Sequence, residues 1–535
     1  MSENRDYDAV IIGGGHNGLV CGAYLAKAGR KVLVLERRDL LGGAAVTEEI
    51  WPGYRVNTAS HMLGLMQPRV VLDLELQKFG YDVVPVTPGV HLVEGVGPVV
   101  LWKEPERLQA ELARFSKRDA EAYPRFQAHL AKVAPVFRRM LWEIPPDPAR
   151  RGAGNLLRLA RLAWRNRDAL PLFHDLTDLL SMSVHDYVGR WFESDEARVI
   201  LGYYPAGAAG QSTSIHTPGT AYLLLRNHMR DGSDPAGGTG LARGGMGMIS
   251  EAIAASGRRW GMRTRTGAEV AEVLMQDGRA CGVRLADGET IRARSVVSNA
   301  AAQHLFADLL PASATPEPFR RGVAGIHGTV TTFKIHLAVD APIPFAGLKE
   351  AGYPEGSYPI QITLAPSLAY VERAYTDMLG GSIAERPYMT VQTPTLADPG
   401  LAPPGKHLIS IYGGHIPAGP NSDQGDEMRE RLFARVMDTI AEHAPGFDRR
   451  WTHRQILLPR DYEQIFRLPG GSPHHGDLTP DQLFFRRPMP GHADYRTPVP
   501  GLFLCGASAH PGGGVTGVPG HNAARVVNAA LGRGS

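Results

Sequence analysis

The sequence is poor in cysteine and has no long apolar run. Its 535 residues include three cysteines, Cys21, Cys281 and Cys505, which lie far apart and form no C-x-x-C pair. This spacing argues against a disulfide framework, a dithiol redox centre and a metal site, and we expect none of these. No stretch approaches the roughly 20 uninterrupted apolar residues of a spanning helix. The polar start "MSENRDYDAVII" lacks the pattern of a signal peptide. We therefore expect a cytoplasmic protein.

Neither sign of charge predominates. The chain has 57 basic and 54 acidic residues, a net charge of +3, and no long basic run. This balance argues against a nucleic-acid partner. The length is too great for one hydrophobic core and predicts two or three domains.

The clearest motif lies near the start of the chain. A buried strand at 9–12 is followed by Gly13-Gly14-Gly15-His16-Asn17-Gly18, a helix, and a second strand at 31–35 that ends at Glu36. This is the G-x-G-x-x-G fingerprint of a dinucleotide site in its full strand–turn–helix–strand context. Gly13 permits the turn, Gly15 lets a diphosphate approach, and Gly18 lets the helix pack closely. The helix start at His16 and Asn17 offers free N–H groups to the diphosphate, and Glu36 would bind the ribose.

The residues after Glu36 favour FAD. An acid at this position disfavours the 2′-phosphate of NADP. Gly42 and Gly43 follow six and seven residues later, and this second glycine pair resembles the motif of flavin amine oxidases and carotenoid desaturases. An ordinary loop turn is the alternative. Arg37 and Ala44 complete this part of the predicted site. The glycine-rich stretch 243–257 lacks a preceding strand and a following acid, so we expect no separate NAD domain.

The middle and the end of the chain return to the same site. D-G turns between alternating apolar residues predict strands at 269–275, 280–285 and 290–293. In Rossmann-type flavoproteins the strand carrying Val270 typically lies over the adenine, and the next strand leads into a small-residue loop at Asn299. A last strand at 502–505 runs into Gly506 and Ala507, which we expect at the diphosphate. The backbone at Gly514, Val515 and Thr516 would lead a helix whose positive end faces the flavin ring.

These returns predict an α/β protein with two domains. The Rossmann-type FAD-binding domain would consist of three segments, 1–90, 240–310 and 495–535. Residues 91–239, mostly helical, and 311–494, with strands at 328–340, 387–395 and 406–414, would form an inserted α+β substrate domain.

A basic amphipathic helix is predicted within residues 149–173. Arg158, Arg161 and Arg165 form one stripe at helical spacing, and Leu156, Leu159 and Leu162 form another. We favour a helix packed on the core with a solvated basic face. The alternative is a helix that lies on an anionic membrane surface, which would make the protein peripheral to a membrane.

Both ends of the chain resemble one family. The segments "DAVIIGGGHNGLVCGAYLAKAG", "LLGGAAVTEE" and "GLFLCGASAHPGGGVTGVPGHNAARVV" resemble the phytoene desaturase and retinol saturase family, while "GGMG" and "DQLFFRRP" resemble a separate branch of it. The resemblance runs from about residue 7 to 532. It implies noncovalent FAD in a p-hydroxybenzoate-hydroxylase-like domain. It also implies the removal or addition of hydrogen at carbon–carbon bonds of an apolar substrate of isoprenoid or polyene type.

Desaturation of this kind needs few side chains, because the substrate hydride goes to flavin N5. His475 and His510 are the candidate catalytic bases, with His521 as a third, and each could instead be a polar residue satisfied within a loop. Two rival functions are a flavin amine oxidase, disfavoured because no acid follows Gly506 closely, and a flavin-binding scaffold without turnover. The electron acceptor, oxygen or a quinone, stays open, as does the oligomeric state, for which a homodimer is one option.

Overall fold

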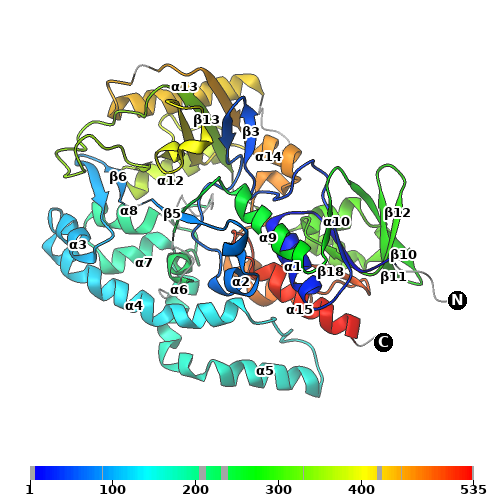
Figure 1. The fold of residues 1–535 in the computed structure, drawn as a ribbon. Coiled ribbons are helices and arrows are strands. Elements are labelled where there is room, and N and C mark those ends of the chain that lie inside the picture. The colour runs from blue at the N-terminus through cyan, green and yellow to red at the C-terminus, as the bar shows by residue number, and fades with distance from the viewer. Residues whose placement is uncertain are drawn as a thin grey trace.

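The computed structural model describes residues 6–86, 88–203, 213–230, 239–328, 331–418, 425–447 and 449–532. The outer ends of the predicted FAD segments, 1–5 and 533–535, lie outside these residues, as do 329–330 of the strand predicted at 328–340. The chain forms two large sheets, with a group of helices beside the second one (Figure 1).

The first sheet has seven strands in the order β10-β11-β12-β1-β2-β9, with β18 also paired to β12. Its strands are β1 (Tyr7–Ile12), β2 (Val32–Leu35), β9 (Arg263–Arg265), β10 (Val270–Gln276), β11 (Arg279–Leu285), β12 (Thr290–Ser298) and β18 (Leu502–Leu504). Strand β12 joins two patterns, because its first residues pair antiparallel with β11 and its later residues pair parallel with β1 and β18. The sequence pattern predicted two separate strands here, one at 290–293 and a buried one that leads to Asn299. The structure joins them in the single strand β12.

Helices from three distant parts of the chain cover this sheet. They are α1 (His16–Lys27), α9 (Gly247–Arg259), α10 (Ala302–Asp308), α11 (Glu317–Ala324) and α15 (Val518–Gly532). Helix α1 packs against both α9 and α15, and their apolar side chains share one core with the parallel strands. The strands of this sheet and all of these helices except α11 fall within the three predicted FAD segments, whose boundaries stay a prediction.

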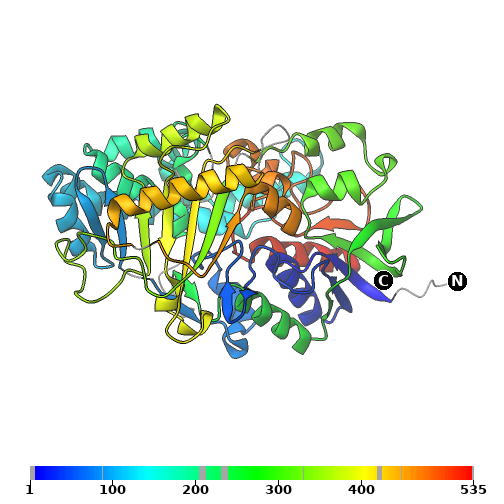
Figure 2. The ribbon, with the colours of Figure 1, turned by 90° about the horizontal axis from the view of Figure 1, so that it is seen from above.

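The second sheet also has seven strands, in the order β17-β13-β16-β15-β14-β6-β7. Its strands are β6 (Gly89–Val93), β7 (Gly97–Leu101), β13 (Thr332–Val339), β14 (Gln361–Leu364), β15 (Met389–Gln392), β16 (His407–Gly414) and β17 (His453–Leu457). Figure 2 shows α13 (Asp426–His443) lying across one face of this sheet, where apolar side chains of both form a core. Helix α12 (Leu368–Leu379) and helix α14 (Pro459–Phe466) follow strands of the same part of the chain.

The region 91–239 was predicted to be mostly helical, and this is wrong at its start. Strands β6 and β7 form a hairpin that completes the edge of the second sheet, with Val90 paired to Ile362. The helices that follow are α3 (Pro105–Ala113), α4 (Lys117–Leu141), α5 (Ala153–Arg165), α6 (Phe173–Ser181), α7 (Val184–Trp191) and α8 (Asp195–Tyr203). Their buried residues form a third apolar cluster.

Several short elements connect the two large sheets and the helical region. Two small sheets pair β3 (Glu48–Trp51) with β4 (Tyr54–Val56) and β5 (Val83–Pro85) with β8 (Gly240–Ala242). The short helices are α2 (Pro68–Asp73), η1 (Leu76–Phe79), η2 (Arg167–Leu172), η4 (Ala221–His228), η5 (Ala312–Ala314), η6 (Pro394–Leu396), η7 (Pro399–Leu401), η8 (Pro469–Gly471), η9 (Pro480–Gln482) and η10 (Phe484–Arg486). Within the described ranges, no helix combines the length and the apolar character needed to cross a membrane.

Candidate flavin site

The parallel strands of the first sheet end side by side and bring distant segments together. Ile12 pairs with Leu35 on one side and with Ser298 on the other, and Ser298 pairs with Leu504. The residues after these strands therefore meet at one edge, where parallel sheets bind their ligands. A cavity at this edge contains eleven of the predicted cofactor residues, namely Gly13, Gly15, His16, Asn17, Glu36, Arg37, Gly43, Ala44, Val270, Asn299 and Ala507.

The start of α1 is prepared for an anion. Gly15 is its N-cap, and no side chain caps the first turn, so the free N–H groups of that turn face the cavity. Within the described chain, Asn17 Oδ1 and His16 Nε2 are buried without a hydrogen-bond partner. Burial lowers the pKa of His16 to about 4, against the opposing effect of a hydrogen bond to Gly514. A neutral His16 and a row of uncapped N–H groups fit the diphosphate of FAD.

Glu36 closes the opposite side of the turn. Its Oε2 accepts a hydrogen bond from Gly14 N–H at 2.8 Å, and its Oε1 accepts one from Arg38 N–H at 2.9 Å. Glu36 as a residue is 8% exposed, and each carboxylate oxygen retains a lone pair for a further donor. This geometry suits two ribose hydroxyl groups.

Two glycines in the turn are fixed by close contacts. A Cβ on Gly18 would lie 2.3 Å from the carbonyl oxygen of Gly13, so the start of α1 could not stay against β1. A Cβ on Gly15 would lie 2.7 Å from Asn299 Nδ2 and would enter the cavity. The first obstacle to a side chain at Gly15 is therefore the Asn299 amide.

The other six predicted cofactor residues do not line this cavity. Gly18 serves the helix packing just described, and Gly42 N–H donates to Gly14 O at 2.9 Å beside the parallel bridge of Gly15 and Gly42. Thr516 Oγ1 accepts from the N–H of Val518, the first residue of α15, at 3.2 Å. The remaining three, Gly506, Gly514 and Val515, lie in the loop between β18 and α15.

Sequence reasoning missed a whole wall of the cavity. Residues 465–468, which end α14 and follow it, line it together with Arg38, His304 and Leu309. Arg37 Nη2 donates to Ile465 O at 2.7 Å, and the Arg38 guanidinium lies 5.0 Å from the Phe466 ring centroid. These residues carry no local sequence motif. They reach the site only because the part of the chain that contains the second sheet packs against the part that contains the first.

The three candidate histidines differ in their surroundings. His475 lines the cavity, and its Nδ1 lies 3.2 Å from Ser508 Oγ. Burial, with added effects of Arg487 and His16, lowers its pKa to about 3. A group with this pKa is neutral at pH 7 and is a weak base. His510 lies outside the cavity lining and its Nε2 is 2.8 Å from Met140 O, while His521 packs edge-on between Tyr24 and Trp142.

Two buried arginines hold the C-terminal loop. Arg487, from the "DQLFFRRP" segment, donates to Ala507 O at 2.8 Å, Asp477 O at 3.0 Å and Gln482 O at 3.1 Å, and also to His474 O. Burial lowers its pKa to about 10, so it stays cationic at neutral pH. Arg226 Nη2 donates to Gly513 O at 3.3 Å. Sequence reasoning assigned the positive charge here to a helix end alone and missed both side chains.

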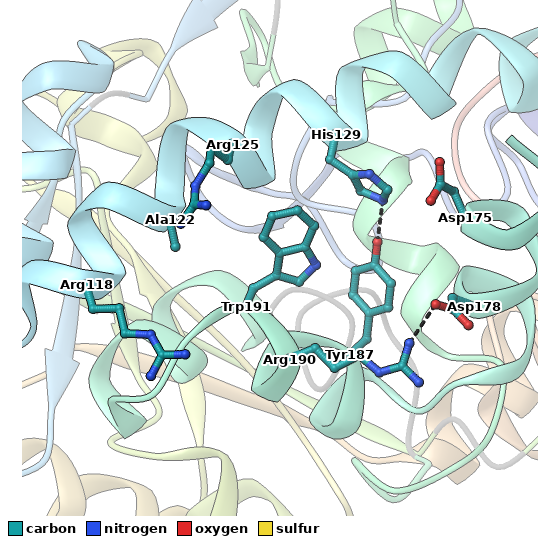
Figure 3. A pocket seen from close by; sticks show the side chains of 9 residues that line it. All are labelled: Arg118, Ala122, Arg125, His129, Asp175, Asp178, Tyr187, Arg190 and Trp191. Carbon is teal, nitrogen blue, oxygen red and sulfur yellow. Dashed lines mark hydrogen bonds and ion pairs between the residues drawn. The ribbon is translucent and has the colours of Figure 1, made fainter. Parts of the chain in front are cut away.

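Two surface features lie apart from this cavity. Figure 3 shows an open pocket between α4, α6 and α7, in which His129 and Tyr187 point toward each other and Arg190 pairs with Asp178. Nearby, ligand atoms of His185 and Asp186 on α7 and of His216, which precedes η4, lie within 4.8 Å of one another, a grouping that could hold a metal ion. Arg190 and Arg198 line the same surface, and their positive charge opposes a bound cation.

The comparisons with known proteins agree with this geometry. Residues 18–528 match the family described as flavin containing amine oxidoreductase. Pyridine nucleotide-disulfide oxidoreductase domain-containing protein 2 of Mus musculus is 37% identical over 98% of this chain and 93% of its own. A limonene dehydrogenase subunit of Castellaniella defragrans is 28% identical (98% and 95% covered). A lycopene-forming phytoene desaturase of a Paracoccus species is 25% identical (96% and 95%).

Solved structures share the fold at low identity. An oxidoreductase from Methanosarcina mazei has a TM-score of 0.62 and 19% identity over 97% of this chain and 99% of its own. Putrescine oxidase bound to putrescine has a TM-score of 0.57 and 15% identity over 98% and 99%. The expected resemblance and the expected cofactor are confirmed. The chain belongs to the flavin-containing amine oxidoreductase family and is an FAD-dependent oxidoreductase.

Proposed function

We propose that this enzyme dehydrogenates a carbon–carbon bond of a largely hydrocarbon substrate of isoprenoid or polyene type. One substrate carbon gives up a hydride and its neighbour a proton, so that a single bond becomes a double bond. FAD, when bound, supplies the two-electron sink for the hydride. The segments that would hold it are the α1 start, Glu36 and the loop 506–517.

The charge around the C-terminal loop carries the proposal. Within the described ranges, the charged side chains that contact residues 506–517 are Arg226 and Arg487. The nearby buried acid, Asp477, acts on Arg487 as an opposite charge, which raises the pKa of that guanidinium against the larger effect of burial, and its carboxylate lies 3.9 Å from His327 Nε2. Two guanidinium groups stabilise negative charge that develops on a ring beside them. They also repel an alkylammonium substrate, which favours a neutral substrate over an amine.

The names of two relatives support the same reaction class. The limonene dehydrogenase and the phytoene desaturase are named for unsaturated hydrocarbons. The alignments with these two relatives cover nearly the whole of this chain, so the similarity includes the second sheet as well as the cofactor motif.

The face of the second sheet opposite α13 adds a feature of the substrate. Alternate residues of β13, β15 and β16 on this face include the polar Lys334, His336, Thr390, Gln392 and Tyr412, beside the apolar Ala338 and Leu408, and all but Tyr412 are buried. Within the described chain, neither ring nitrogen of His336 has a hydrogen-bond partner. A purely hydrocarbon ligand on this face would leave such groups unpaired.

This polar face lies close to the flavin site. Lys334 Nζ donates to Ala59 O at 2.7 Å, and the His61 ring lies 4.8 Å from Tyr412. The same segment returns to the cavity, since Ser60 N–H donates to Ala44 O at 2.9 Å. We therefore include in the proposal that the substrate carries an oxygen function beside its hydrocarbon chain.

Anaerobic reduction tests the proposal. The flavin-loaded enzyme is mixed with isoprenoids, polyenes and primary amines, and the loss of flavin absorbance is followed. We expect bleaching by unsaturated isoprenoids and none by amines. Arg226→Met should keep FAD but slow the bleaching, whereas the exposed α15 variant Arg525→Met should not. Re-oxidation with oxygen or with a quinone then identifies the electron acceptor.

Two results would favour the rival functions. Bleaching by amines alone would support amine oxidation, the activity suggested by the shared fold with putrescine oxidase. A flavin that no donor of either class reduces, although dithionite does, would support a binding protein without turnover.

A further inference from the structure

Helix α5 presents an apolar surface to solvent. Leu156 is 62% exposed, Leu157 70% and Trp164 67%. Asn155 is the one residue of this helix that is buried. In Figure 1 the helix lies at the lower edge of the molecule, away from both large sheets.

The direction of this surface follows from helical geometry. At about 100° per residue, Leu157 and Trp164 lie roughly 20° apart and about 140–160° from the half-buried Leu159 and Leu162, whereas the exposed Leu156 lies between the two groups. The helix therefore uses one apolar stripe to attach to the protein and leaves a second, larger one uncovered.

Further exposed apolar residues follow the helix along the chain. Leu170 in η2 is 73% exposed, and Phe173 at the start of α6 is 63% exposed. Five of the eleven large hydrophobic residues exposed in the described chain thus fall within residues 156–173. We call Leu156, Leu157, Trp164, Leu170 and Phe173 the α5 surface. Such a concentration marks an interaction site, whereas scattered exposed residues do not.

Positive charge surrounds the α5 surface. Residues 148–167 contain no acid and include six arginines, namely Arg150, Arg151, Arg158, Arg161, Arg165 and Arg167. Arg165 pairs with Glu143 at 3.0 Å, and the Arg167 guanidinium lies 4.3 Å from the Trp164 ring. The arginines without an ion pair in the described chain, beside exposed leucines and a tryptophan, fit an occupant that is both apolar and anionic.

This chemistry distinguishes the possible occupants. A second copy docked through the same surface would bring two arginine clusters together, because a twofold interface is self-complementary. A lipid surface accepts Leu, Trp and Phe at the level of the acyl chains and offers phosphates to arginine. We propose that the α5 surface docks the protein on an anionic membrane.

The proposal goes beyond the oxidoreductase function and does not depend on it. Docking involves the helical region, whereas the candidate flavin site lies at the edge of the first sheet. Vesicle binding would therefore support the docking proposal whether or not the protein oxidises the proposed substrate.

Vesicle flotation of the flavin-loaded full chain tests the docking. The vesicles contain phosphatidylcholine alone or phosphatidylcholine with phosphatidylserine. We expect flotation with the anionic vesicles, at least tenfold more bound protein than with the neutral ones, and a decrease on addition of salt. The triple variant L156S/L157S/W164S should lose at least tenfold of this binding while keeping its FAD. The variant R158Q/R161Q should lose the preference for anionic vesicles.

A matched control uses an exposed leucine elsewhere. Leu379 on α12 is 68% exposed, and Leu379→Ser should bind vesicles like the parent protein. Equal binding by the triple variant, or equal loss in Leu379→Ser, would overturn the proposal. Light scattering tests the alternative occupant, since a dimer that the triple variant converts to a monomer, with vesicle binding unchanged, would show that a second copy covers the surface.

Discussion

Replacing Glu36 by glutamine tests the cofactor geometry most directly. The two carboxylate oxygens of Glu36 each accept one backbone N–H, from Gly14 and from Arg38. Glutamine keeps the size of the side chain and removes its charge. Its single amide oxygen can accept only one of these N–H groups, and its amide nitrogen faces the other.

The size of the effect follows from hydrogen-bond energies. A hydrogen bond to a charged group contributes about 1.5–3 kcal/mol and one between neutral groups about 1 kcal/mol. For a ribose hydroxyl bound at Glu36, the substitution therefore removes about 0.5–2 kcal/mol of binding, roughly a 2- to 30-fold rise in the Kd of FAD. The buried N–H left unpaired costs about 1–3 kcal/mol of stability in addition.

Titration of the apoprotein with FAD measures the first effect, and thermal unfolding without FAD measures the second. Glu272→Gln is the control, since Glu272 lies on β10 at the edge of the same sheet, and its carboxylate pairs with Arg284 at 3.2 Å on the surface. An unchanged Kd with lowered stability would show that Glu36 only braces the turn. A Glu36→Gln variant unchanged in both respects would refute the site as described.

Three further predictions concern packing, pH and the substrate. Gly520→Ala should destabilise the protein by about 1–3 kcal/mol, measured by denaturant unfolding, because its Cβ would lie 2.2 Å from Asn17 O where α15 meets α1, whereas Gly154→Ala, which meets nothing within 4 Å, should not. Stability should fall as the pH drops below 6.5, since the unfolded state then binds protons that the folded state excludes. The groups responsible are the buried histidines whose pKa burial lowers to about 3 or 4, namely His16, His61, His91, His415, His475 and His510. Melting temperatures measured between pH 7 and 5 check this prediction. A melting temperature that does not change with pH would contradict the buried, neutral state of these histidines. An oxygenated isoprenoid should show a kcat/KM at least about tenfold above that of its parent hydrocarbon, and equal values would remove the polar face of the second sheet from the substrate site.

The part of the site that the sequence predicts is the part in which neighbours in the chain are neighbours in space. The turn from Gly13 to Gly18 and the acid at Glu36 follow one another within a single βαβ unit, so their spacing carries their geometry. The wall at 465–468 is different. Phe466 meets Arg38 only because the chain has first completed the second sheet and then returned through α14.

The second sheet shows the same limit of prediction from local sequence patterns. Strands β13, β15 and β16 are predicted within a few residues, because their apolar alternation is local. The hairpin of β6 and β7 escapes prediction because its partner, β14, lies some 270 residues further along the chain. We propose that the boundary of the FAD segment near residue 90 belongs before this hairpin.

Helix α5 shows what an amphipathic pattern leaves undetermined. The spacing of Leu156, Leu159 and Leu162 indicates an apolar stripe, and packing of that stripe on the core was the favoured interpretation. The structure divides the stripe, since Leu159 and Leu162 are half-buried while Leu156 is exposed. A periodicity fixes the angles between side chains around the helix axis but not the direction of the helix relative to the body. That direction depends on which face the rest of the fold can cover. Because α5 lies at the edge of the molecule, the body covers only the side that carries Asn155, Leu159 and Leu162, and the arginines flank an apolar face that only an external surface can cover.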